Sequence, residues 1–121
     1  MENIERWPSC GVERFLFLME GPWATRIINE LFCGSLRFTE LKQKLPNISA
    51  HTLTHRLRRF ESFGIVVRTV HAEVPPRVIY ELTASGRALH EILYAMKDWG
   101  EQLEPKIIDL VGGSQEKDPL F

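Results

Sequence analysis

The stretch from residue 39 to residue 82 changes halfway from helical to extended periodicity, and this order restricts the fold more than any other feature. Apolar residues recur at helical spacing in residues 39–45 and again in residues 49–63. Pro46 separates the two segments, because proline cannot continue a helix. Ser49 suits the N-cap of the second segment, since its hydroxyl oxygen can accept an orphan backbone N–H. The sequence therefore predicts two consecutive short helices joined by a tight turn.

Two β-rich segments follow and predict a hairpin. Residues 65–70 and 77–82 are rich in β-branched and aromatic residues, and the link between them contains Pro75 and Pro76. Gly64 is the expected C-cap of the preceding helix. Three further helices are predicted at 11–20, 23–33 and 84–103, the last capped by Thr83, and a short extended piece at 35–37. This order is that of a winged helix–turn–helix domain, a mainly α fold with a small β-hairpin wing in the α+β class.

The same region concentrates the positive charge of the chain. Residues 37–77 hold eight Lys and Arg and three Glu, a net charge of +5, although the whole chain has a net charge of −1. A local excess of cations matters more for nucleic-acid binding than the overall charge does. The alternative is a solvated basic helix on a protein-interaction domain.

On a helical wheel, residues 49–63 have one apolar side and one side of hydrogen-bond donors and cations. Leu53, Leu57 and Phe60 fall together and are expected in the core, and Arg56 lies towards that side. In a helix–turn–helix, the N-terminal part of the second helix meets base edges in the major groove of DNA. The predicted base-reading residues are Ser49, Ala50, His51, Thr52, Thr54 and His55. The predicted phosphate contacts are Arg58 and Arg59, Lys42 and Lys44 on the preceding helix, and Arg77 at the base of the wing.

A family resemblance covers the chain from about Cys10 to Leu103. The longest matching run extends from Glu73 to Thr83, and shorter matches lie at 10–13, 21–23, 37–41, 48–49, 53–57 and 64–66. In these residues the chain resembles the HxlR family of winged-helix transcriptional regulators, relatives of the MarR type. It departs from the family where Gly11 replaces a usual proline and Pro22 a usual lysine. The resemblance implies a cytoplasmic homodimer that binds double-stranded DNA as a repressor or activator.

The predicted helix at 84–103 has a wider apolar side than burial on one core requires. A second copy of the chain is expected to cover it, as the resemblance also implies. Two-fold symmetry then predicts an inverted-repeat DNA site. The alternative is that residues 106–111 fold back over this surface. The predicted dimer interface comprises Phe15, Leu89, Ile92, Leu93, Met96 and Trp99.

Cys10 is the candidate redox sensor. It precedes a predicted helix, where free backbone amides and the helix dipole lower the pKa of a thiol. Some members of the HxlR family, which the chain resembles, sense oxidants or electrophiles through a cysteine at this position. The alternative for Cys10 is an unreactive thiol. Cys33, the other cysteine, lies near an apolar helix side and is expected to serve packing.

Other site chemistry finds little support in the sequence. His51 and His55 have a spacing that can bind zinc, but no partner ligands lie nearby in sequence, so no metal and no cofactor are predicted. No nucleophile–base pair, paired carboxylates or phosphate loop is recognisable, so the chain is not expected to be an enzyme. The candidates for lining a small-molecule effector pocket at the dimer interface are Phe15, Phe17, Trp23 and Trp99, although aromatic residues at this spacing more commonly serve the core.

The length of 121 residues fits one domain. We expect an N-terminal arm at 1–10, the winged helix–turn–helix domain with its dimerisation helix at 11–103, and a C-terminal segment with a disordered tail at 104–121. No signal peptide is recognisable, and no apolar run approaches the roughly 20 residues of a membrane span, so we expect a cytoplasmic protein without membrane contact. The main alternative function is a winged-helix protein-interaction module without DNA binding.

Overall fold

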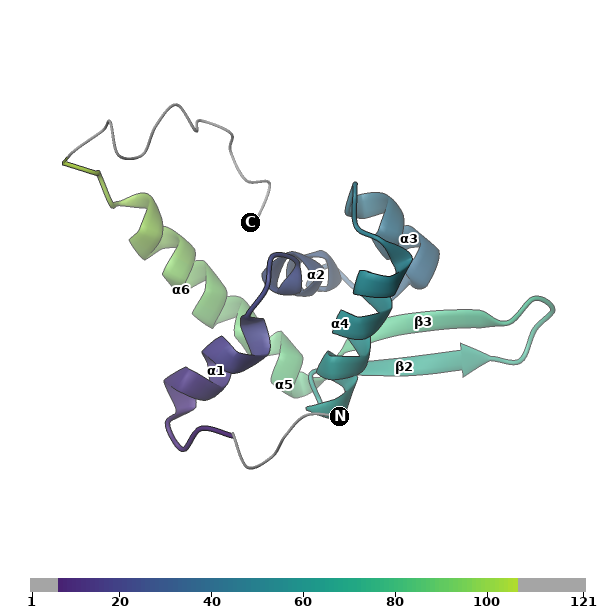
Figure 1. Ribbon diagram of the computed structural model, residues 1–121. Coiled ribbons are helices and arrows are strands. Elements are labelled where there is room, and N and C mark those ends of the chain that lie inside the picture. Colours follow the sequence, from purple (N-terminus) through teal and green to yellow (C-terminus); the bar gives the residue numbers. More distant parts are fainter. Residues whose placement is uncertain (1–6, 107–121) are drawn as a thin grey trace.

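Six helices and a small antiparallel sheet make up residues 7–106, which are the residues that the computed structural model describes (Figure 1). Residues 1–6 and 107–121, which include most of the predicted arm, the 106–111 segment and the tail, lie outside the described residues. The elements are α1 (Gly11–Met19), α2 (Ala24–Leu31), β1 (Leu36–Arg37), α3 (Phe38–Lys44), α4 (Ala50–Ser62), β2 (Val66–His71), β3 (Arg77–Leu82), α5 (Ala84–Arg87) and α6 (Leu89–Glu101).

The sheet has the strand order β1-β3-β2, and both pairings are antiparallel. In the hairpin, Val66 pairs with Leu82 and His71 pairs with Arg77, which confirms the predicted wing. Leu36 of β1 pairs with Tyr80 and so attaches the hairpin to the segment that enters α3. The hairpin and α6 project to opposite sides of the molecule (Figure 1).

The two ends of α4 are capped as the sequence predicts. At the start, the Ser49 hydroxyl oxygen accepts the backbone N–H of Thr52 at 3.0 Å. At the end, Gly64 has a φ of +72°, a left-handed conformation that favours glycine. The Ile65 N–H donates to the Phe60 carbonyl at 2.9 Å and the Gly64 N–H to the Glu61 carbonyl at 3.1 Å, which together form a Schellman motif.

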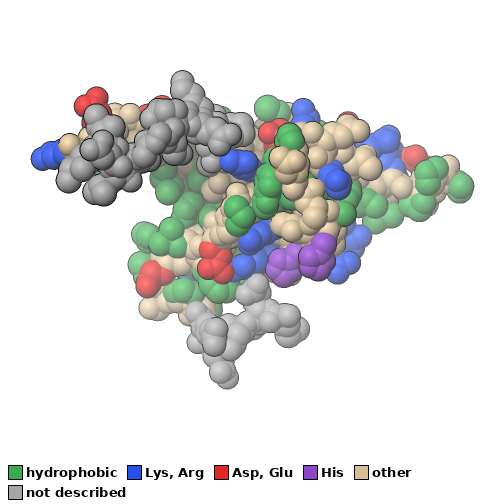
Figure 2. Space-filling view, turned by 45° about the horizontal axis from the view of Figure 1, so that its top comes forward, with side chains coloured by type: hydrophobic (Ala, Val, Ile, Leu, Met, Phe, Trp, Pro, Cys, Tyr) green, Lys and Arg blue, Asp and Glu red, His purple; other side chains and the backbone are tan. Residues whose placement is uncertain are grey.

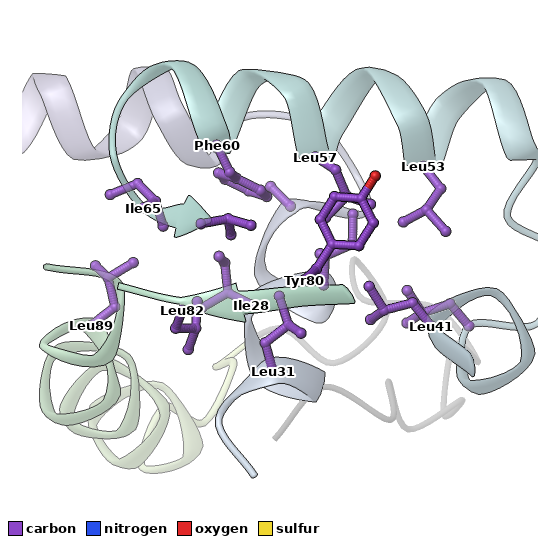
Figure 3. Packing of buried hydrophobic residues seen from close by; sticks show 14 of the residues in the cluster. Ile28, Leu31, Leu41, Leu53, Leu57, Phe60, Ile65, Tyr80, Leu82 and Leu89 are labelled. Carbon is purple, nitrogen blue, oxygen red and sulfur yellow. The ribbon is translucent and has the colours of Figure 1, made fainter. Parts of the chain in front are cut away.

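The apolar side of α4 lies at the centre of the core. Leu53, Leu57 and Phe60 are each no more than 1% exposed, as the helical wheel predicts. Figure 3 shows them facing β3, where Tyr80 and Leu82 are also buried. Burial of this side fixes the rotation of α4 about its own axis, and the opposite side of the helix is left to the solvent.

The predicted single helix at 84–103 is two helices, α5 and α6, that meet at Ala88. Ala88 has a ψ of −20°, above the helical average, and the regular helix is interrupted there. Thr83 caps α5 as predicted, because its hydroxyl oxygen accepts the Gly86 N–H at 3.1 Å. A Cβ atom on Gly86 would lie 2.3 Å from the Ile65 carbonyl oxygen, so α5 packs more closely against the start of β2 than a larger residue allows.

Replacing Leu57 by alanine should reduce the free energy of unfolding by about 2–5 kcal/mol, because it leaves a cavity in the core. Val67→Ala is the matched control, since Val67 is exposed on β2, and should cost less than about 1 kcal/mol. Chemical denaturation followed by circular dichroism measures both losses. Equal losses would show that the side chains of α4 do not form the core.

Candidate DNA-binding surface

The exposed side of α4 carries hydrogen-bonding and cationic side chains. His51, His55 and Arg58 are exposed, and Thr54 is half-buried. These residues lie three or four positions apart and therefore share one side of the helix. In Figure 2, two histidine side chains lie together with Lys and Arg side chains on both sides of them. The surface can donate and accept hydrogen bonds and can bind anions.

Two of the predicted base-reading residues already make local contacts. The Ser49 hydroxyl donates to the Thr52 hydroxyl oxygen at 2.9 Å while it caps the helix. Ala50, at the first turn, is exposed and contributes only its methyl group. The side chains of His51, Thr54 and His55 make no such cap contact, so they are the more available groups for a ligand.

The predicted phosphate-binding residues differ in how they are engaged. Lys42, Lys44 and Arg58 are exposed, and within residues 7–106 none of them is in an ion pair. Arg77 lies at the turn end of the wing, not at its base as predicted, and is paired with Glu73 at 2.8 Å. A phosphate that binds Arg77 must therefore compete with the Glu73 carboxylate.

Arg59 does not lie on the solvent side of α4, contrary to its predicted position. Its side chain is 9% exposed, and its guanidinium donates to the Phe17 carbonyl oxygen of α1 at 2.6 Å. Arg56 also turns towards α1 and donates to the Glu20 carbonyl oxygen at 2.9 Å, which agrees with its place on the wheel. The helical wheel did not predict the contact of Arg59, because it shows on which side of α4 a residue lies but not where α1 packs against that helix.

A cleft of about 390 Å³ lies between the start of α3 and the turn of the hairpin. Its cationic groups are Arg37 and Arg77, and Glu73 is its acidic group. The remaining lining residues are Phe38, Thr39, Val74, Pro75, Pro76 and Val78. The cleft connects α3 with the wing, and sequence analysis did not predict it because its two walls are far apart in the chain.

Within a single chain, the four aromatic residues predicted to line an effector pocket at the dimer interface lie in different surroundings. Phe17 packs edge-on against Trp7 and Phe63. Trp23 lies beside Arg26 in a hollow of about 50 Å³, and Trp99 is exposed on α6. Phe15 packs partly buried against the core. Within residues 7–106, these side chains therefore form no common pocket.

Cys10 is the exposed N-cap residue of α1. The backbone N–H groups of Glu13 and Val12 lower the pKa of the Cys10 thiol, and the positive charge of Arg14 adds to the effect. This is the electrostatic environment that the sequence predicted for a reactive thiol. Cys33 is exposed as well, so its predicted role in packing is wrong.

Exposed apolar side chains, here called the exposed apolar surface, lie on α1 and on α6. Both helices lie away from the hairpin (Figure 1). Of the predicted interface residues, Ile92, Met96 and Trp99 are exposed. Leu89 and Leu93 instead lie in the core of their own chain and are not available to a partner. Three further exposed apolar residues, Val12 and Leu16 on α1 and Leu103 just after α6, were not among the predicted interface residues. The spacing of Val12 and Leu16, four positions apart, could have identified them.

Within residues 7–106, no group of three or more His, Cys, Asp and Glu side chains could hold a metal ion. In the same range, the helices are too short or too polar to cross a membrane.

Comparisons with known proteins converge on one class. Residues 18–107 match the family model described as HxlR-like helix-turn-helix. The HTH-type transcriptional regulator YdeP of Bacillus subtilis is 36% identical over 118 residues, which cover 98% of this chain and 92% of YdeP. Relatives of this kind are named transcriptional regulators rather than enzymes.

Solved structures of redox regulators are similar to this chain. The reduced form of the redox regulator HypR has a TM-score of 0.71 and 40% identity, covering 76% of this chain and 91% of HypR. The reduced form of the transcriptional regulator YodB from Bacillus subtilis has a TM-score of 0.72 and 36% identity, covering 79% of this chain and 95% of YodB. YodB has also been solved after diamide treatment and with a quinone bound.

Proposed function

This chain belongs to the HxlR-like helix-turn-helix family of transcriptional regulators, and from that premise we propose that it binds an inverted-repeat operator as a homodimer and responds to oxidants through Cys10. The observation that carries the proposal is the exposed side of α4. Buried apolar residues hold this helix in place, and its free side has donors and cations with no carboxylate near its centre. A duplex supplies the matching base edges and phosphates.

Base reading is assigned to the N-terminal half of α4, as in helix–turn–helix domains generally. His51, Thr54 and His55 are the principal candidates, and Ser49, Ala50 and Thr52 lie beside them at the start of the helix. Phosphate binding is assigned to Arg58, Lys42 and Lys44, three exposed cations that are in no ion pair in the described part of the chain. Arg77 would also bind a phosphate of the DNA backbone, which would take the place of the Glu73 carboxylate.

Arg58→Ala should weaken binding to every duplex about equally and reduce the slope of log affinity against log salt by about 1, because it removes one phosphate contact. His51→Ala and Thr54→Ala should instead reduce the preference for the selected duplex over a random one, by about tenfold for a lost base contact. Fluorescence anisotropy with a duplex selected by the purified wild type from a random library measures both effects. Binding that does not depend on salt, or no binding to any duplex, would favour the protein-interaction module.

A homodimer is the second part of the proposal. The exposed apolar side chains of α1 and α6 make a surface that monomeric soluble proteins seldom leave open. A second copy is the natural cover, because two-fold symmetry brings the same apolar patch from each chain into contact. The dimer would present two copies of α4 at a fixed separation, as an inverted repeat requires.

Ile92→Glu combined with Trp99→Glu should convert the protein into a monomer, because it buries carboxylates in the interface. The control is Val67→Glu with Val74→Glu, which adds the same charge to exposed positions of the hairpin and should leave a dimer. Light scattering coupled to gel filtration gives the mass of each variant. A wild-type mass equal to one chain would remove the dimer from the proposal.

The redox part of the proposal rests on the lowered pKa of Cys10, and the redox regulators HypR and YodB support it by analogy. The lowered pKa increases the fraction of thiolate at neutral pH, and the thiolate is the form that oxidants and electrophiles attack. Cys10 is also exposed, so a reagent can reach it.

Diamide should release the wild type from the selected duplex and leave Cys10→Ser bound. The rate of release should rise with pH around a midpoint below the roughly 8.5 of an ordinary thiol, since the thiolate is lost as pH falls through the lowered pKa. Anisotropy after a pH series of short treatments measures this rate. Cys33→Ser is the matched control and should behave as the wild type, whereas equal release of wild type and Cys10→Ser would refute the assignment.

A further inference from the structure

Two arginines of α4 hold the C-terminal end of α1. Arg56 Nη1 donates to the Glu20 carbonyl oxygen at 2.9 Å, and Arg59 Nη2 donates to the Phe17 carbonyl oxygen at 2.6 Å. Arg59 Nη1 also lies 3.6 Å from the Glu20 carboxylate. The last carbonyl groups of a helix have no partner within it and carry partial negative charge. The two guanidinium groups therefore supply both the hydrogen bonds and the charge that this helix end lacks. We call these contacts the arginine clamp.

Packing makes the arginine clamp rigid. The Arg59 guanidinium lies over the Phe17 ring, 4.5 Å from its centroid, and the side chain is almost removed from water. Gly21, with a φ of +99°, turns the chain directly beneath Arg56, and a Cβ atom there would lie 1.9 Å from Arg56 Nη2. A side chain at position 21 would therefore displace Arg56.

A second contact joins α4 to the segment that precedes α1. The Trp7 ring stacks on Phe63 with a centroid distance of 4.9 Å and an angle of 18°. Phe17 of α1 packs edge-on against both rings. The C-terminal end of α1 and the segment before α1 are thus both tied to the C-terminal half of α4 and its C-cap residue. The N-terminal half of α4 carries the proposed base-reading residues.

We propose that Arg56 and Arg59 are positioning residues for DNA recognition: they fix α4 relative to α1 and do not contact DNA themselves. This inference rests on the proposed function. Because α1 carries Val12 and Leu16 of the exposed apolar surface, the clamp also sets where each α4 lies in the dimer. Loss of the clamp misplaces the base-reading side while leaving the phosphate-binding cations exposed.

The salt dependence of binding separates positioning from contact. A residue that neutralises a phosphate releases counterions, so its loss reduces the salt slope by about 1 on every duplex. A residue that only orients α4 leaves the slope unchanged and reduces the affinity for the selected sequence alone. Arg58, exposed on the same helix, is the matched control because its loss removes the same charge.

The experiment compares Arg59→Gln and Arg58→Gln in the full chain, on the duplex selected by the wild type and on a random-sequence duplex. We expect Arg59→Gln to weaken the selected duplex about tenfold, the effect of one lost base contact, with an unchanged salt slope and unchanged random-duplex binding. Arg58→Gln should weaken both duplexes equally and lower the slope by about 1. An Arg59→Gln variant that lowers the slope in the same way, or that keeps wild-type affinity, overturns the inference.

Two further variants keep the test independent of folding losses in Arg59→Gln. Gly21→Ala displaces Arg56 without changing any charge or any residue of α4, although alanine is strained at a φ of +99°. It should show the same selective loss with an unchanged slope. Arg59→Lys keeps the charge but loses the planar fork that binds two acceptors, so it should rescue only part of the affinity, and full rescue overturns the clamp. Circular dichroism and dimer mass verify each fold. A wild type that selects no duplex refutes the proposed function instead.

Discussion

Burial of one side of α4 decides what the rest of the molecule can do. Leu53, Leu57 and Phe60 are excluded from water and meet β3 and the neighbouring helices (Figure 3). A helix that is held along one side cannot rotate, so its other side is presented at a constant angle to the surroundings. The hydrophobic contact that stabilises the fold therefore also orients the side chains proposed to read DNA.

The helix α1 links features that lie apart in the sequence. Cys10 stands at its start, Val12 and Leu16 extend its exposed side, and its last carbonyls bind the arginines of α4. Through these three connections, α1 joins the proposed sensor, the proposed dimer surface and the proposed recognition helix. Its connection to α4 consists of hydrogen bonds and ring contacts between described residues, and not of spatial nearness alone.

Charge in the basic region is divided between binding and structure. Arg56, Arg59, Arg68 and Arg77 each contact a carbonyl or carboxylate of the same chain. The net charge of +5 over residues 37–77 therefore overstates the cations that are free for a nucleic acid. Within the described residues, Arg37, Lys42, Lys44 and Arg58 are the cations of this region that are exposed and in no ion pair. Because Arg77 must leave Glu73 before it binds a phosphate, a DNA contact by the wing costs more free energy than a contact by the exposed cations of α3 and α4.

The sequence by itself determined the order of elements, the caps at Ser49, Gly64 and Thr83, and the buried side of α4. These properties depend on periodicity and on hydrogen bonds between residues close in the chain. Only the tertiary structure decided that Arg59 contacts α1, that Leu89 and Leu93 lie in the core of their own chain, and that a cleft forms beside the wing. The reason is physical: the clamp contacts join residues 36 and 42 positions apart, and no local pattern records which helix end a side chain will meet.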